Sequence, residues 1–326
     1  MIEVHDLVKR YGTVDAVKGV SFSLGQEEVL GFLGPNGAGK TTIMKILTGY
    51  HFPTFGTAQV NGISVEDEPE KVKSLIGYLP EAVPLYYDLT VEEYLDFVAQ
   101  SRLIPRGERK KRLNYALDAC GLGPLRKRKI EQLSKGYKQR TGLAQAIIHD
   151  PPILILDEPT TGLDPNQIIE IRGLIQALGK SKTVILSTHI LQEVEAVCNR
   201  VLILNEGRIA AAGTASEIAL AIKGGETWAV TLKAAGEGAV QKALEKLASK
   251  LGGIEKEALT LSPEGSFDLS FCIQGQNEAN ADAPSSAELI FDWAVKSKFK
   301  ILKMDKKRLS LEEIFVKLTH SKEDAQ

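Results

Sequence analysis

The sequence predicts an α/β fold for the first two thirds of the chain and a smaller α+β unit for the rest. Over residues 1 to about 212, apolar runs typical of strands alternate with helical patterns, which is the order of an α/β sheet. A glycine-rich loop interrupts this order between an early strand and a helix. After Gly213 the composition shifts toward Ala, Lys and Glu, and the expected elements follow a βαββαβ order.

The α/β part is expected to contain a helical insertion. Its strands are expected in the segments EVLGFLG, TAQVNG, PPILILDE, KTVILST and RVLILNEGRIAAAG. Residues from about 88 to 150 have mostly helical apolar spacing, in VEEYLDFVAQSRL, GERKKRLNYALDACGL and KGYKQRTGLAQAIIHD. We therefore expect one domain over residues 1–215, with a helical subdomain at about 88–150, and a second domain over residues 216–326.

The second domain is expected to be ferredoxin-like. WAVTLK, EALTL, SFDLSFCIQ and FKILKMD are typical of strands, and GAVQKALEKLASKL and AELIFDWAVKSK are typical of helices. Their βαββαβ order is that of the ferredoxin-like fold. A polar linker, GQNEANADAPSS, separates the third strand from the second helix, and a last helix is expected in SLEEIFVKLTH.

Composition excludes several classes of protein. Charged residues make up 25% of the chain and hydrophobic residues 43%, as in ordinary globular proteins. The net charge of −2 gives the whole chain no reason to bind nucleic acid. No apolar run approaches the roughly 20 residues that a membrane span requires. The three scattered cysteines suit a reducing cytosol and show no metal-binding spacing.

The segment GPNGAGKT, residues 34–41, predicts a phosphate-binding loop, because it follows a strand and precedes a helix. Glycines let backbone N–H groups surround phosphate oxygens without an obstructing β-carbon, and the following helix adds the positive end of its dipole. Lys40 is expected to reach the β- and γ-phosphates, and the hydroxyl of Thr41 is expected to bind Mg²⁺. The residues expected to hold the nucleotide here are Gly34, Pro35, Asn36, Gly37, Ala38, Gly39, Lys40, Thr41 and Thr42.

The segment ILILDEP, residues 153–159, is an apolar strand that ends in two acids. A strand buried on both faces tolerates charge only at its end, where a ligand can compensate it. Asp157 is expected in the magnesium shell, and Glu158 is expected to be the general base that polarises water for attack on the γ-phosphate. The strand end and the phosphate loop together predict an ATPase that binds ATP and Mg²⁺.

Three further motifs follow in order: LSKGYKQR at 133–140, TTGLD at 160–164 and LSTHI at 186–190. With them, residues 1 to about 215 resemble the ABC-transporter ATPase family. The resemblance implies that Tyr11 in KRYG stacks on adenine and that His189 hydrogen-bonds the γ-phosphate.

The resemblance also implies a head-to-tail homodimer, in which each ATP lies between the phosphate loop of one copy and LSKGY of the other. Ser134 and the N–H of Gly136 open a helix, so they offer donors and a positive dipole end to a γ-phosphate. Asp164 is expected to make contacts across the dimer.

Two positions depart from the family pattern. Lys135 and Tyr137 stand in the segment that is usually LSGGQ, and Lys135 either adds an ammonium group near the phosphates or points outward. Glu81, in IGYLPEAVPLYYDLT, stands where the family has a glutamine. Its carboxylate is expected either to bind Mg²⁺ in the loop that links nucleotide to membrane partner, or to be an ordinary surface acid.

These features favour an energy-coupling subunit of an exporter, peripheral on the inner, cytoplasmic face of the membrane. The absence of a span leads us to expect a separate integral-membrane permease. IGYLPEAVPLYYDLTVEEYL, LSKGYKQR and SLEEIFVKLT resemble the branch that serves ABC-2-type exporters, including gliding-motility and multidrug-type systems. The alternative is an ABC ATPase that acts on nucleic acid or ribosomes. Such proteins usually carry two cassettes or a long coiled-coil insertion, and this chain has neither.

Overall fold

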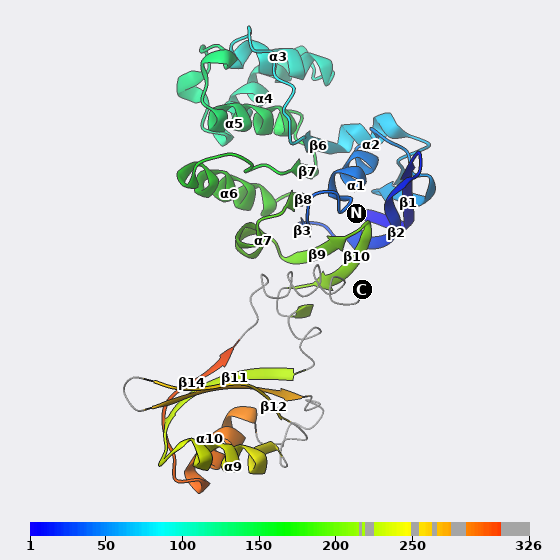
Figure 1. The fold of residues 1–326 in the computed structure, drawn as a ribbon. Coiled ribbons are helices and arrows are strands. Elements are labelled where there is room, and N and C mark those ends of the chain that lie inside the picture. The colour runs from blue at the N-terminus through cyan, green and yellow to red at the C-terminus, as the bar shows by residue number, and fades with distance from the viewer. Residues whose placement is uncertain (215–216, 219–224, 249–253, 263–265, 275–284, 308–326) are drawn as a thin grey trace. The chain divides into compact units, whose positions relative to one another are not determined.

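A computed structural model describes residues 1–214, 217–218, 225–248, 254–262, 266–274 and 285–307 (Figure 1). Its contacts divide the chain into two compact units, with the boundary between Ala215 and Ser216. Most of the expected linker GQNEANADAPSS and all of the expected helix SLEEIFVKLTH lie outside the described residues. Within the described ranges, no helix combines the length and the apolar character that crossing a membrane requires.

A six-stranded sheet forms the centre of the larger unit, in the order β10-β9-β3-β8-β7-β6. Its strands are β3 (Val29–Leu33), β6 (Ile76–Leu79), β7 (Ile153–Asp157), β8 (Thr183–Thr188), β9 (Arg200–Asn205) and β10 (Arg208–Gly213). All neighbours are parallel except the β9–β10 hairpin. In this register Leu33 lies opposite Thr188, and Asp157 lies opposite Ser187. The carboxyl ends of β3, β7 and β8 therefore share one edge, where ligands bind in sheets of this kind.

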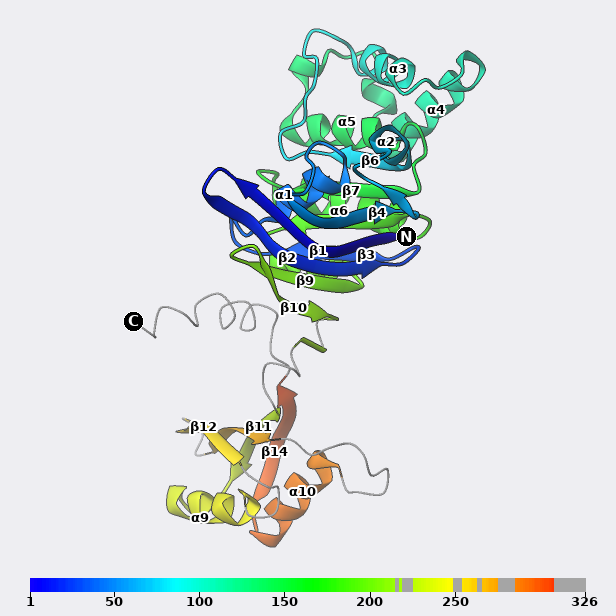
Figure 2. The same ribbon diagram turned by 90° about the vertical axis from the view of Figure 1, so that its right-hand side faces the viewer.

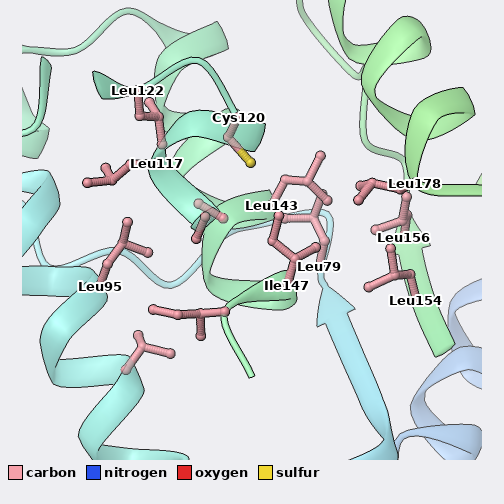
Figure 3. Close-up of a cluster of buried hydrophobic side chains, with 14 of the residues drawn as sticks. Leu79, Leu95, Leu117, Cys120, Leu122, Leu143, Ile147, Leu154, Leu156 and Leu178 are labelled. Atoms are coloured by element: carbon pink, nitrogen blue, oxygen red, sulfur yellow. The ribbon is translucent and has the colours of Figure 1, made fainter. Parts of the chain in front are cut away.

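Strand β7 is buried along its whole length because its faces belong to two hydrophobic cores. Ile153 and Ile155 pack in the core that includes the first helix, α1 (Lys40–Leu47). Leu154 and Leu156 pack on the opposite face, in the core shown in Figure 3. This arrangement explains the continuous apolar run in the sequence and leaves the end of the strand as the place for charged groups.

The second core joins the sheet to a layer of three helices (Figures 1 and 2). These helices are α3 (Val91–Ser101), α4 (Arg106–Ala119) and α5 (Lys135–Ile147), which confirms the expected helical subdomain. Thr90 and Glu93 form a capping box at the start of α3. Near the end of α5, Gln145 donates a hydrogen bond of 2.7 Å to the carbonyl oxygen of Tyr78. The helical layer is thereby tied to β6.

The remaining elements of this unit flank the sheet. The helices are α2 (Pro69–Leu75), α6 (Pro165–Gly179) and α7 (Leu191–Val197), and a second, antiparallel sheet has the order β2-β1-β4-β5. The strands of that sheet are β1 (Ile2–Tyr11), β2 (Val14–Leu24), β4 (Phe55–Val60) and β5 (Ile63–Ser64). The apolar pattern of TAQVNG predicts β4, whereas the long β1–β2 hairpin was not expected. Register shifts interrupt the alternation of β1, which weakens its strand pattern.

The smaller unit has the expected ferredoxin-like order. Its elements are β11 (Gly225–Lys233), α9 (Glu237–Ala248), β12 (Ile254–Leu261), β13 (Phe267–Gln274), α10 (Ser286–Lys296) and β14 (Lys300–Lys307). The strands pair antiparallel in the order β12-β13-β11-β14, and both helices cover one face of the sheet (Figure 1). Trp228, Val230 and Leu232 alternate along β11 toward that face and form a core with Trp293 of α10.

His149 leads to a prediction about stability in acid. Its Nε2 lies 3.2 Å from the carbonyl oxygen of Ile76, and its buried Nδ1 has no hydrogen-bond partner. Burial, with a smaller effect of the Arg102 guanidinium, lowers the pKa of His149 to about 4. As pH falls below about 6.5, the unfolded chain therefore takes up a proton that the folded chain refuses. We expect the free energy of unfolding to fall between about pH 6.5 and 4, by as much as about 3 kcal/mol.

The measurement is urea unfolding of the full chain at several pH values, followed by circular dichroism. His149→Gln should flatten the loss of stability in this pH window, whereas His5→Gln, at an exposed position, should leave it unchanged. Both tryptophans, Trp228 and Trp293, lie in the smaller unit, whereas His149 lies in the larger one. Tryptophan fluorescence therefore reports the unfolding of the smaller unit separately. Equal pH dependence in His149→Gln and the parent would contradict this role for His149.

Candidate functional site

The glycine-rich loop lies between β3 and α1, as the sequence predicts. Gly37 and Gly39 adopt positive φ angles of 82° and 101°, which favour glycine, and Gly39 is the N-cap of α1 without a side-chain cap. Ala38 N–H donates to the carbonyl oxygen of Pro35 (3.2 Å), which tightens the loop. Asn36 and Gly37 are exposed at its tip. The loop thus presents backbone N–H groups at a helix N-terminus, which suits phosphate.

Lys40 folds back over this loop. Its ammonium group donates to the carbonyl oxygens of Gly34 (2.7 Å) and Pro35 (3.2 Å), and lies 3.7 Å from Oε1 of Glu158. Burial lowers the pKa of Lys40, while the carboxylates of Glu158, Asp157 and, more weakly, Glu81 act in the opposite direction. The cation of the loop and the acids of β7 therefore form one electrostatic cluster.

Asp157 offers an oxygen that suits a metal ion. Its Oδ1 accepts hydrogen bonds from the hydroxyls of Thr41 (3.2 Å) and Ser187 (2.5 Å). Its Oδ2 is buried and has no hydrogen-bond partner. A buried carboxylate oxygen without a partner is costly, and a hard cation such as Mg²⁺ would satisfy it.

The described residues contain no group of three or more His, Cys, Asp or Glu side chains able to hold a metal. Mg²⁺ bound to nucleotide is usually held by only one or two carboxylates together with the phosphates. The residues present therefore fit a magnesium–nucleotide complex, with Thr41 and Asp157 as ligands. Thr42, the next residue of α1, is half-buried.

Glu158 follows Asp157 in a strained backbone conformation. Its φ of 48° is uncommon for a non-glycine residue, and such residues cluster at functional sites. The N–H of Glu158 donates to the hydroxyl of Ser187 (3.0 Å). Its Oε2 accepts from the hydroxyl of Thr161 (3.0 Å) and lies 2.9 Å from Nδ1 of His189. The Glu158 side chain is 8% exposed and that of His189 is 48% exposed, so the pair lies at the surface end of the cluster.

Glu81 is exposed in the loop after β6. Its carboxylate raises the pKa of Lys40, although less than Glu158 and Asp157 do, so it lies within electrostatic range of the phosphate loop. The loop packs closely on α5, because a β-carbon at Gly142 would lie 2.6 Å from the side chain of Val83. The loop of Glu81 thus packs on the helical layer, within electrostatic range of the phosphate loop.

Tyr11 lies at the end of β1, with 42% of its surface exposed. It pairs with Val14 across the hairpin, and its ring meets His51 edge-on at 5.7 Å. The same hairpin approaches the phosphate loop, because a β-carbon at Gly39 would lie 2.7 Å from the carbonyl oxygen of Ala16. Tyr11 is therefore an exposed aromatic residue on the hairpin that contacts the phosphate loop through Ala16.

Ser134, Gly136 and Asp164 form a second group. Ser134 is the N-cap of α5 and Asp164 is the N-cap of α6. The two helix starts touch, because the side chain of Gln167 occupies the space beside Gly136. The ammonium group of Lys135 lies against Gly162, so the exposed side chain of Lys135 contacts the TTGLD loop of its own chain. Within the described residues, no hydrogen bond joins Ser134 to the phosphate loop.

Ser187 is a site residue that the sequence analysis does not single out. Its hydroxyl donates to Asp157, its carbonyl oxygen accepts from the N–H of Glu158 (3.2 Å), and its hydroxyl accepts from the same N–H. The sequence could have pointed to Ser187, because it lies inside the LSTHI motif that carries His189.

Comparison with known proteins agrees with this geometry. Residues 17–161 match the family model described as ABC transporter. The linearmycin resistance ATP-binding protein LnrL of Bacillus subtilis is 38% identical over 70% of this chain and 73% of its own length. The Nod factor export ATP-binding protein I of Ralstonia nicotianae is 34% identical over 67% of this chain and 68% of its own length.

A solved dimeric ATP-binding cassette, in a post-hydrolysis state with ADP and Pi, is 27% identical and has a TM-score of 0.60. The match covers 66% of this chain and 98% of that one. ATPases of this family bind ATP with Mg²⁺, hydrolyse it, and work as dimers with membrane permease partners. The chain belongs to the ATP-binding proteins of the ABC transporter family.

Proposed function

We propose that this protein hydrolyses ATP as a head-to-tail dimer and drives export through a separate ABC-2-type permease at the inner face of the cell membrane. The observation that carries the proposal is the cluster of Lys40, Asp157, Glu158 and His189, with one oxygen of Asp157 left without a partner. The names of relatives linked to linearmycin resistance and Nod factor export favour export over import.

Each residue of the cluster has a distinct proposed role. Lys40 and the loop N–H groups bind the phosphates, while Thr41 and Asp157 bind the metal. Bound ATP with Mg²⁺ supplies the γ-phosphoryl group that is transferred to water. The carboxylate of Glu158 accepts a proton from that water, and Nδ1 of His189 fixes the orientation of the carboxylate. The side chain of His189, which is 48% exposed, is assigned a hydrogen bond to the γ-phosphate.

The second group of residues, Ser134, Gly136 and Asp164, is proposed to contact the partner subunit and its nucleotide. Ser134 and Gly136 lie at the N-terminus of the 13-residue helix α5, where backbone N–H groups and the helix dipole favour an anion. We assign them to the γ-phosphate bound by the partner subunit, with Asp164 at the same interface. Among the described residues, Ser134 makes no hydrogen bond to the phosphate loop of its own chain, which supports this arrangement.

The permease is proposed to dock in a groove between the sheet and the helical layer. The groove has a volume of about 860 Å³, and its lining includes Tyr50, Tyr78, Leu103 and His149. Leu103 is 86% exposed and Tyr50 is 69% exposed, while the hydroxyl of Tyr78 is buried without a partner. Exposed apolar side chains that gather on one surface are typical of a site that another chain covers.

We also propose that residues 1–215 and 216–326 are separate domains, the second being accessory to the first. The two units have separate hydrophobic cores. Loss of ATP binding in a chain that ends at Gly213 would contradict this division.

Glu158 and Lys40 should differ in the step that they affect. Glu158→Gln should retain ATP and reduce steady-state hydrolysis by about 10²- to 10⁴-fold, because an amide cannot accept the proton. It should also leave an ATP-bound dimer that is visible by size exclusion. Lys40→Ala should weaken ATP binding and prevent that dimer. A loss of hydrolysis smaller than about tenfold in Glu158→Gln would remove Glu158 as the base.

Glu81 is tested by varying the Mg²⁺ concentration. Glu81→Gln keeps a carbonyl oxygen that can bind the metal, so the apparent affinity for Mg²⁺–ATP should fall only modestly. Glu81→Ala should cost more, chiefly in the hydrolysis that the permease stimulates. The measurement is ATP hydrolysis against Mg²⁺ concentration for the three proteins, with and without permease. If Glu81→Ala matches the parent throughout, Glu81 is a surface acid without a role in the site.

A further inference from the structure

A buried carboxylate outside the cluster connects the segments that carry Glu158 and His189. Glu193 on α7 is 1% exposed. One of its oxygens accepts a hydrogen bond of 2.5 Å from the hydroxyl of Thr160, and the other accepts one of 2.8 Å from the hydroxyl of Thr188. The guanidinium of Arg172 on α6 lies 3.8 Å away. This single side chain therefore joins α6, α7, the end of β8 and the loop after β7.

The two threonines stand next to the proposed site residues in sequence. Thr188 immediately precedes His189, and its hydroxyl also accepts from the N–H of Ile190 (3.0 Å), on the other side of His189. Thr160 lies two residues after Glu158, and it is 3% exposed. By holding both hydroxyls, Glu193 fixes the backbone on each side of the contact between Glu158 and His189.

The backbone at Glu158 needs such support. Its φ of 48° lies in the left-handed region, which a non-glycine residue keeps only when the surrounding structure holds it there. Ser187 holds the N–H of Glu158 on one side. The bond from Thr160 to Glu193 anchors the chain on the other side.

Stability alone explains the buried acid poorly. Buried ion pairs are often no more stabilising than well-packed apolar side chains. Here the separation from Arg172 is 3.8 Å, and Nε of Arg172 is buried without a hydrogen-bond partner. The interaction that is well formed is the one with the two threonine hydroxyls, and it leads to the hydrolytic site.

We infer that Glu193 is a positioning residue for ATP hydrolysis. It holds Thr160 and Thr188 so that Oε2 of Glu158 and Nδ1 of His189 stay in contact at 2.9 Å. It does not touch the nucleotide and acts through the two segments that it joins. The inference rests on the proposed function, because that proposal assigns Glu158 and His189 to hydrolysis.

The test uses the full chain with Glu193→Gln, which alters both hydrogen bonds of the carboxylate, and, separately, Thr188→Val, which removes the one to Thr188. Both variants should lower kcat by at least about tenfold, because small displacements of reacting groups are costly. Both should bind ATP within about twofold of the parent, since the phosphate loop is untouched. Thr141→Val is the matched control, because Thr141 is also buried and donates to a carbonyl oxygen, that of Tyr137 (2.8 Å). It should keep the parent kcat.

The double variant Glu193→Gln with Thr188→Val separates positioning from general destabilisation. If Thr188 acts through Glu193, the double variant should lose little more kcat than Glu193→Gln alone. Multiplied losses, or a parent-like kcat in both single variants, would overturn the role of Glu193.

Measuring Glu158→Gln in the same assay distinguishes a failure of this inference from a failure of the proposed function. An inactive Glu158→Gln beside fully active Glu193→Gln and Thr188→Val overturns this inference alone. An active Glu158→Gln overturns the proposed function and this inference with it.

Discussion

The site depends on the burial of two adjacent carboxylates at the end of β7. Asp157 is 1% exposed and Glu158 is 7% exposed. Removing such charges from water costs several kcal/mol each unless other groups compensate them. The compensation comes from three directions: the Lys40 ammonium on α1, the Ser187 hydroxyl on β8, and His189 just beyond that strand. The positions of these elements around the sheet edge follow from that requirement.

The same edge is connected to the helical layer through α5. Ser134 caps the start of this helix, and Gln145 near its end donates a hydrogen bond to the carbonyl oxygen of Tyr78. Gly142, in between, packs against Val83 in the loop that carries Glu81. A helix of 13 residues spans about 20 Å. The helix that starts at the segment assigned to the partner's ATP therefore also packs against the loop that carries Glu81.

The sequence predicts the parts of this arrangement that depend on local signals. The glycine spacing around Lys40 and the apolar strand before Asp157 are sufficient to predict both halves of the site. The β1–β2 hairpin is not predicted, because register shifts, such as the one between Val4 and Leu7, interrupt the alternation that marks a strand. The role of Glu193 is also hidden, since its bond to Thr160 joins residues 33 positions apart. The positive φ of Glu158 has no sequence signal, because the residue type does not favour that conformation.

The central claim is that the unpaired Oδ2 of Asp157 is the oxygen that binds the metal of Mg²⁺–ATP. The most direct measurement is the affinity for ATP by calorimetry, with Mg²⁺ and with EDTA, for the parent and for Asp157→Asn. The account predicts that Mg²⁺ strengthens binding in the parent, whereas Asp157→Asn binds ATP about equally well with and without the metal. If Asp157→Asn retains the full effect of Mg²⁺, the buried oxygen is not a metal ligand and the account of the site is wrong.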